Sequence, residues 1–287
     1  MNSVPDGQRR ANNVDAVTVA GFGEEWSAFD QSRLSEKELQ TQFDAYFACF
    51  RWDLVDGNSV GVDVGCGSGR WARLLAPRVG HLHCVDPSDK ALEVAKRNLR
   101  TLANVTFHHA DASAILIQVA SMDFVISLGV LHHVPDTAAA IDSCVKLLKP
   151  GAPILLYLYY RFDSRPAWFR AIWFASDLLR RLISRLPIGP KKVVADLLAV
   201  TVYLPVARTC KLLESVGTSV HHIPLSVYRN RSFYTMRTDA LDRFGTRLEH
   251  RFTRTEIAKM LVDADCDDIR FSSCEPFWCV CATRKAT

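Results

Sequence analysis

The sequence predicts an α/β fold in which helices connect the strands of a mostly parallel sheet. Between residues 60 and 158, short apolar and β-branched runs alternate with segments of helical periodicity. A glycine-rich turn follows the first of these runs directly. Such alternation implies right-handed crossovers, which bring the carboxyl ends of the parallel strands to one edge of the sheet. We therefore expect a ligand site at that edge.

Five strands and three helices account for this alternation. Strands are expected near residues 60–64, 81–86, 104–108, 122–127 and 152–158. Helices are expected near residues 69–77, 88–100 and 137–148. The first strand shows the basis of these assignments, because Val60, Val62 and Val64 suit a buried strand and helical spacing resumes at Trp71.

The turn after the first strand reads Gly65-Cys-Gly-Ser-Gly69. A strand-to-helix junction presents free backbone N–H groups, and glycine lets a ligand approach where a Cβ atom would collide. This favours a nucleotide site. A dinucleotide fingerprint would need glycine at position 70, where the chain has Arg70.

The loop and the segments after it resemble the motifs of the class I S-adenosylmethionine (SAM) methyltransferases. Asp63 precedes the G-x-G-x-G loop, and Asp86 ends the second strand 21 residues after Gly65. Asp111 follows the third strand in Ala-Asp-Ala. Residues 122–136 are similar to the family's fourth motif, and residues 147–157 to its fifth strand with the Lys-Pro-Gly turn before it. The order and spacing of these matches identify the chain as a member of the UbiE/Coq5-like "methyltransferase type 11" group.

The resemblance implies a Rossmann-like sheet of seven strands, mostly parallel with the last strand antiparallel, and a helical insertion after strand 5. It is strong over residues 58–158 and looser over 20–52 and 236–283. The last helix is expected at 253–264 and the last two strands near 268–273 and 277–283.

The resemblance also implies SAM as the cofactor and S-adenosylhomocysteine as its product. The glycines would hold the methionine part, Asp86 the ribose hydroxyls, and Asp111 with Ala112 the adenine. Trp26 lies in a Phe-Gly-x-x-Trp element that closes over the cofactor in related enzymes, although it could equally pack an N-terminal helix. The expected cofactor-binding residues are Asp63, Gly65, Cys66, Gly67, Gly69, Asp86, Pro87, Asp111, Ala112, Ser127, Leu128 and Trp26.

Five regions are expected along the chain: a mobile tail (1–18), cap helices (19–57), the SAM-binding core (58–160), a helical insertion (161–250), and a C-terminal helix with two strands (251–287).

The insertion is expected to form a lid over the substrate, because it follows the fifth strand. Its pattern predicts an amphipathic helix over residues 166–186, a second helix over 192–216 kinked near Pro205, and a long polar and aromatic loop over 221–249. A packing element, a dimer interface and a membrane-surface helix remain alternatives. We expect no membrane span, because the apolar stretch at 193–207 is shorter than the roughly 20 residues that a span needs.

Methyl transfer needs chiefly a well-placed acceptor, and a base only when the acceptor carries a proton. His132 is the candidate base, although a structural role is the alternative for this residue and for His133. Solvated surface positions are the alternative for the candidate substrate contacts. Those contacts are Tyr228, Tyr234, Asp242 and Arg243.

Composition limits the remaining possibilities. The net charge of +4 is too small to argue for nucleic acid by itself, and scattered cysteines without a signal sequence suggest a reducing cytoplasm. No metal site is expected, because Cys279 and Cys281 lack a C-x-x-C pair or matched histidine. A small-molecule acceptor is the expected partner, a homodimer is possible, and peripheral membrane contact is left open.

These observations favour transfer of a methyl group from SAM to a small or lipophilic metabolite by in-line displacement. One alternative is a methyltransferase of a tRNA wobble base, since such enzymes use a similar core. Another is a catalytically silent protein that binds SAM as a scaffold. The glycine loop alone does not distinguish SAM from a modified SAM.

Overall fold

The computed structural model describes residues 13–163 and 165–286, so most of the expected tail lies outside the described residues. The chain divides into two compact units, each described here by itself. The core unit comprises residues up to Ser27, Gln40–Arg161 and Leu248 onward, and the helical unit comprises Ala28–Leu39 and Phe162–Arg247.

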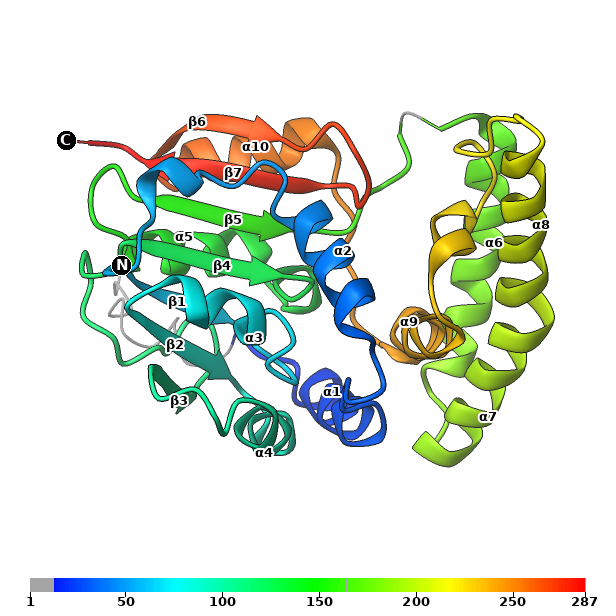
Figure 1. Ribbon diagram of the computed structural model, residues 1–287, viewed down its shortest axis with the longest axis horizontal. Coiled ribbons are helices and arrows are strands. Elements are labelled where there is room, and N and C mark those ends of the chain that lie inside the picture. The colour runs from blue at the N-terminus through cyan, green and yellow to red at the C-terminus, as the bar shows by residue number, and fades with distance from the viewer. Residues whose placement is uncertain (1–12, 164, 287) are drawn as a thin grey trace, which may run out of the picture. The chain divides into compact units, whose positions relative to one another are not determined.

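The core unit is built on a seven-stranded sheet with the order β3-β2-β1-β4-β5-β7-β6 (Figure 1). β1 to β5 pair in parallel, and β7 runs antiparallel to both β5 and β6. This confirms the predicted fold class. The strands are β1 (Val60–Val64), β2 (His81–Asp86), β3 (Val105–His109), β4 (Phe124–Leu128), β5 (Pro153–Tyr157), β6 (Cys266–Phe271) and β7 (Cys279–Arg284).

Three helices of the core unit begin at polar capping residues. Ser88 caps α4, Asp136 caps α5, and Thr253 forms a capping box with Glu256 at the start of α10. The helices are α1 (Ala16–Ala28), α2 (Glu36–Tyr46, which continues from the helical unit), α3 (Ala72–Leu75), α4 (Asp89–Asn98), α5 (Thr137–Leu147) and α10 (Arg254–Asp263). Short 3-10 turns are η2 (Trp52–Leu54), η3 (Ala76–Arg78) and η4 (Leu131–His133).

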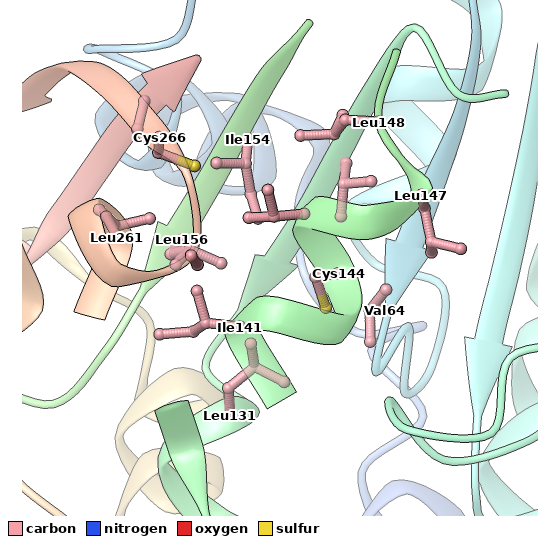
Figure 2. Close-up of a cluster of buried hydrophobic side chains, with 14 of the residues drawn as sticks. Val64, Leu131, Ile141, Cys144, Leu147, Leu148, Ile154, Leu156, Leu261 and Cys266 are labelled. Atoms are coloured by element: carbon pink, nitrogen blue, oxygen red, sulfur yellow. The ribbon is translucent and has the colours of Figure 1, made fainter. Parts of the chain in front are cut away.

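The main hydrophobic core lies between the sheet and the helices α5 and α10 (Figure 2). Ile154 and Leu156 of β5 meet Ile141 of α5 and Leu261 of α10, and all four are fully buried. Burying each such side chain contributes about 1.5–3 kcal/mol. This packing makes the sheet a rigid support for the carboxyl ends of its strands.

The helical unit packs around its own core, which includes Phe29, Met236, Ala240 and Leu241. Its elements are α6 (Ala167–Ile183), α7 (Ile188–Leu198), the π-helical turn η5 (Ala199–Tyr203), α8 (Leu204–Ser215), η6 (Ser226–Asn230) and α9 (Phe233–Gly245). Where a kink was predicted near Pro205, the structure has the π-helical turn η5, which ends two residues before this proline. A proline has no N–H to donate to the preceding turn, and a π turn accommodates that loss.

Two segments differ from the sequence-based expectations. Residues 233–245 form helix α9, whereas a loop was expected over 221–249, because Ser232 caps the helix and a buried apolar face packs into the unit. Residues Ala28–Leu39 belong to the helical unit, although they were expected among the cap helices. Glu38 accounts for this placement, since its carboxylate accepts hydrogen bonds from the Ser232 N–H and the Thr235 hydroxyl.

The helix from Ile188 to Ser215 is long and apolar enough to cross a membrane, judged by length and composition alone. It has 28 residues and a mean hydropathy of 1.6 over its most apolar stretch, of which 28% is buried within the structure. The expectation of no span rested on the shorter apolar stretch at 193–207. That stretch is one part of a longer continuous helix.

Candidate functional site

The glycine loop folds into a concave turn at the end of β1. Gly65, Gly67 and Gly69 have φ angles of +78°, +53° and +76°, which other residues rarely adopt. The loop is tied to the neighbouring strand, because the N–H groups of Gly65 and Cys66 both donate to the Val85 carbonyl, at 2.7 and 3.0 Å. The glycines are therefore required by the backbone geometry itself.

The indole of Trp26 lies against this loop. A Cβ atom added at Gly67 would stand 2.9 Å from the indole ring. The side chain thus packs α1 onto the loop within the core unit, and its expected closure over a cofactor stays a prediction.

Asp86 closes the other side of the loop at the end of β2. Its carboxylate accepts hydrogen bonds from the Gly67 and Ser88 N–H groups, each at 2.9 Å. Burial raises the pKa of Asp86 to about 6, although these two N–H groups act to lower it. Each carboxylate oxygen has two lone pairs, so both oxygens keep capacity to accept a ligand hydroxyl.

Asp63 is the most unusual group of the site. Its side chain is 1% exposed, and neither carboxylate oxygen has a hydrogen-bond partner among the described residues. Burial, with the nearby Asp86 carboxylate adding to it, raises the pKa of Asp63 to about 7. A buried carboxylate without donors is costly, so this position fits a ligand that brings a positive charge or N–H groups.

The other expected cofactor residues lie along the same edge of the sheet, at or just after the ends of β2, β3 and β4. The Ser127 hydroxyl donates to the Val64 carbonyl at 2.8 Å, which ties β4 to β1, and Leu128 follows it as a buried residue. Asp111 accepts from the Ser113 N–H at 2.7 Å, and Ala112 lies beside it in the same half-buried turn.

Cys66 and Pro87 have supporting positions in this edge. The hydrogen bond with Cys84, together with burial, raises the pKa of the Cys66 thiol well above its ordinary value, so this side chain stays neutral. The Pro87 carbonyl accepts from the His109 ring at 2.8 Å.

An aromatic wall, which the sequence analysis did not identify, lies at the carboxyl ends of β4 and β5. It consists of Tyr46, Trp71, Tyr157 and Tyr159. The ring of Tyr46 lies 4.7 Å from that of Trp71 and 5.0 Å from that of Tyr157, and the two later tyrosines are 5.8 Å apart. The only local signal was the Tyr-rich end of the fifth strand, because Tyr46 and Trp71 reach this place through the fold.

The two adjacent histidines of η4 have different surroundings. Nδ1 of His133 donates to the Leu248 carbonyl at 2.7 Å, and its ring packs against Phe22 at 4.9 Å. The His132 ring stacks on Tyr159 at 3.8 Å and is fully buried, and neither of its nitrogens has a hydrogen-bond partner among the described residues. Burial, with His133 and the Arg251 charge adding to it, holds the pKa of His132 well below its ordinary value. His132 is therefore a neutral imidazole.

The four expected substrate contacts all belong to the helical unit, and their expected role stays a prediction. The Tyr234 hydroxyl accepts from the Gln31 N–H at 2.9 Å, and Tyr228 packs its ring against Tyr203 at 5.1 Å. The Arg243 guanidinium donates to the Ser176 hydroxyl at 3.3 Å. The Asp242 carbonyl accepts from the Thr246 hydroxyl at 2.8 Å.

No group of three or more His, Cys, Asp or Glu residues within the described ranges is placed to hold a metal ion.

Comparison with known proteins identifies methyltransferases. A family model described as a methyltransferase domain matches residues 62–151. A ubiquinone biosynthesis O-methyltransferase of Aromatoleum aromaticum is 32% identical over 45% of this chain and 53% of that protein, so the chain spans about half the length of this relative. An enzyme of the same name from Nitrosomonas europaea is 30% identical over 58% of this chain and 68% of that protein.

Among solved structures, a SAM-dependent methyltransferase from Methanosarcina mazei has a similar fold. It matches with a TM-score of 0.50 and 17% identity, covering 82% of this chain and 97% of that one. At this identity the likeness concerns the fold alone.

Replacing Asp63 with Asn should change how stability depends on pH. The pKa of Asp63 is raised from 3.8 to about 7, so between these values the unfolded chain binds fewer protons than the native one. Wild-type stability therefore falls as the pH rises through that window. Asn does not ionise, so the variant should gain about 2–3 kcal/mol over wild type between about pH 5 and pH 8.

Urea unfolding at the two pH values measures this gain. The exposed Asp44→Asn variant is the matched control, and it should follow the wild type. Parallel pH curves for wild type and D63N would show that Asp63 is not a buried carboxylate of raised pKa.

Proposed function

The chain belongs to the class I SAM-dependent methyltransferases, and we propose that it methylates a hydroxyl group of a small lipophilic acceptor. The observation that carries this proposal is the buried, neutral His132 beside the aromatic wall, at the carboxyl ends of β4 and β5. This edge also holds the glycine loop and the two carboxylates.

The residues present fit SAM. Asp86 retains acceptor capacity for the two ribose hydroxyls, and the unpartnered Asp63 carboxylate suits the positive ammonium end of the methionine part. The positive-φ glycines leave room for the backbone to approach the ligand. When bound, SAM supplies an activated methyl group on a sulfonium sulfur.

His132 is proposed as the group that takes the proton of the acceptor hydroxyl. A hydroxyl oxygen loses its proton as it forms the new bond to carbon, so a base that is neutral at working pH assists the step. The depressed pKa keeps His132 in that form. Stacking on Tyr159 holds the plane of the ring.

The aromatic wall supports a flat or apolar acceptor. The half-buried rings of Tyr46, Tyr157 and Tyr159 offer apolar contact area, with the buried Trp71 packed behind Tyr46. Aromatic side chains also pack directionally with a planar ligand. The names of the two relatives, which both refer to O-methylation in the biosynthesis of a lipophilic quinone, support oxygen as the acceptor atom.

The Asp86→Ala variant should bind SAM and S-adenosylhomocysteine more weakly by about 2–4 kcal/mol, because it removes the acceptors of two ribose hydrogen bonds. Calorimetric titration measures the loss. The control is Glu93→Ala, an exposed position on α4, which should bind as the wild type does. Equal affinity of D86A and wild type would refute the ribose assignment.

The His132→Gln variant should lower kcat by about 10²- to 10⁴-fold, because it removes the base but keeps a planar polar side chain. Its affinity for S-adenosylhomocysteine and its KM for the acceptor should stay within a few-fold of wild type. The rate is measured as label passing from methyl-labelled SAM into the lipid-extract fraction that the wild type modifies. If kcat stays unchanged, or if KM rises instead, His132 is a packing residue.

A further inference from the structure

Helix α6 differs from an ordinary surface helix, because charged side chains are buried on its inner side and leucines are exposed on its outer side. Its buried side carries Asp177, Arg180 and Ser184, which are only 5–6% exposed, while Leu178 and Leu182 are 59% and 60% exposed. The buried polar groups are satisfied, because Arg180 donates to the Asp177 carboxylate at 2.8 Å and to the Thr246 carbonyl at 2.9 Å. Besides this ion pair, the inward side of α6 carries the buried Ile183, and Leu178 and Leu182 face outward.

The long helix from α7 to α8 also exposes large apolar side chains. Its buried stripe consists of Ala195, Ala199, Tyr203, Ala207 and Cys210, whereas Val193, Leu197, Val200, Val202, Leu212 and Val216 are exposed. With α6 it presents one set of exposed large apolar side chains, here called the apolar face. The apolar face consists of Trp168, Ile172, Phe174, Leu178, Leu179, Leu182, Leu186, Val193, Leu197, Val200, Val202, Leu212 and Val216.

The same helices concentrate positive charge. Residues 166–216 carry eight Lys and Arg against three Asp and Glu, a net charge of +5, although the whole chain is only +4. The three acidic side chains are each engaged by an arginine: Asp177 by Arg180, Asp196 by Arg237, and Glu214 by Arg229.

The basic residues exposed among the apolar side chains are Arg170, Arg181, Arg185, Arg208 and Lys211. An apolar helical face bordered by arginine and carrying exposed Trp and Phe is the pattern of helices that lie in a membrane interface. Arginine and lysine can bury their stems there and keep their charges at the lipid headgroups.

We propose that the apolar face of the helical unit lies on the surface of an anionic lipid bilayer. Charge distinguishes this occupant from a second copy of the chain, because a symmetric pair of such faces would bring two sets of five exposed basic side chains together. Anionic headgroups instead neutralise that charge, at about 1 kcal/mol for each basic side chain near the surface. This inference does not depend on the proposed methyl transfer.

The helix contacts within the unit favour a surface position over a span. The buried side of α7 and η5 packs into the core that α9 supplies, through Ala195 and Ala199. Asp196 forms an ion pair with Arg237 at 2.6 Å, and Lys191 donates to the Gly245 carbonyl at 3.0 Å. One side of the helix is thus fixed to protein by polar contacts, which leaves the other side for lipid.

Sedimentation with vesicles tests the proposal on the full chain. The wild type should bind vesicles of phosphatidylcholine with 30% phosphatidylglycerol and bind pure phosphatidylcholine weakly. The double variant Leu178→Gln/Leu182→Gln should lose at least about tenfold in affinity, since each leucine contributes about 1.5–3 kcal/mol when buried in lipid. The matched control is Leu116→Gln, which changes a leucine of the core unit that is 97% exposed, and it should bind as wild type.

A second variant, Arg170→Glu/Arg185→Glu, leaves every apolar side chain in place and should abolish the preference for anionic vesicles. The proposal is overturned if the wild type does not sediment with anionic vesicles, or if both double variants bind as wild type does. Light scattering that finds a wild-type dimer lost in L178Q/L182Q would assign the apolar face to a second copy. Retention on vesicles after alkaline carbonate washing would show a span instead of a surface contact.

Discussion

The rest of the site depends on one buried carboxylate, that of Asp63, which has no hydrogen-bond partner among the described residues. Asp63 lies in the middle strand of a parallel array, where β2 and β4 flank it and exclude water. Such a group is costly to bury unless a ligand supplies donors or positive charge. The stability of the surrounding sheet must offset this cost, and under the proposed function the ammonium end of bound SAM reduces it.

The glycine loop and Asp86 extend that arrangement. The loop passes from β1 into α3 with three positive φ angles, and its N–H groups at Gly65, Cys66 and Gly67 donate to the Val85 carbonyl and the Asp86 carboxylate of β2. Asp86 thereby holds the loop, and under the proposed function its remaining lone pairs accept the ribose hydroxyls. The same carboxylate couples the loop to the second strand, so cofactor recognition and local backbone structure are not separable.

The local parts of this site could be predicted from the sequence because each is encoded within a few residues. A strand, its terminal carboxylate and the glycines after it have fixed spacing, and the parallel pairing of the strands follows from their alternation with helices. The aromatic wall could not be predicted in the same way, since Tyr46, Trp71 and Tyr157 meet only after α2 and β5 are in place. His132 was chosen by its position, but its neutral, stacked state depends on Tyr159 and on burial that no local pattern reveals.

The helical unit shows a second limit of sequence patterns. Amphipathicity predicted where α6 begins and ends within a few residues, but not which face turns inward, because the buried Asp177–Arg180 pair reverses the usual arrangement. The segment expected as a loop is α9, whose buried Met236 and Leu241 complete the core of this unit. The hydrophobic periodicity of a sequence predicts that a helix has two different faces. Which face is buried depends on the contacts that form when the chain folds.

The central proposal is that the protein transfers a methyl group from SAM to a lipophilic acceptor at this edge of the sheet. The most direct measurement incubates the purified protein with methyl-labelled SAM, a cellular lipid extract and total tRNA, and then separates the products. Label in the organic-soluble fraction, absent when the protein is omitted, is the predicted result. Label confined to tRNA, or no transfer to any fraction, would contradict the account.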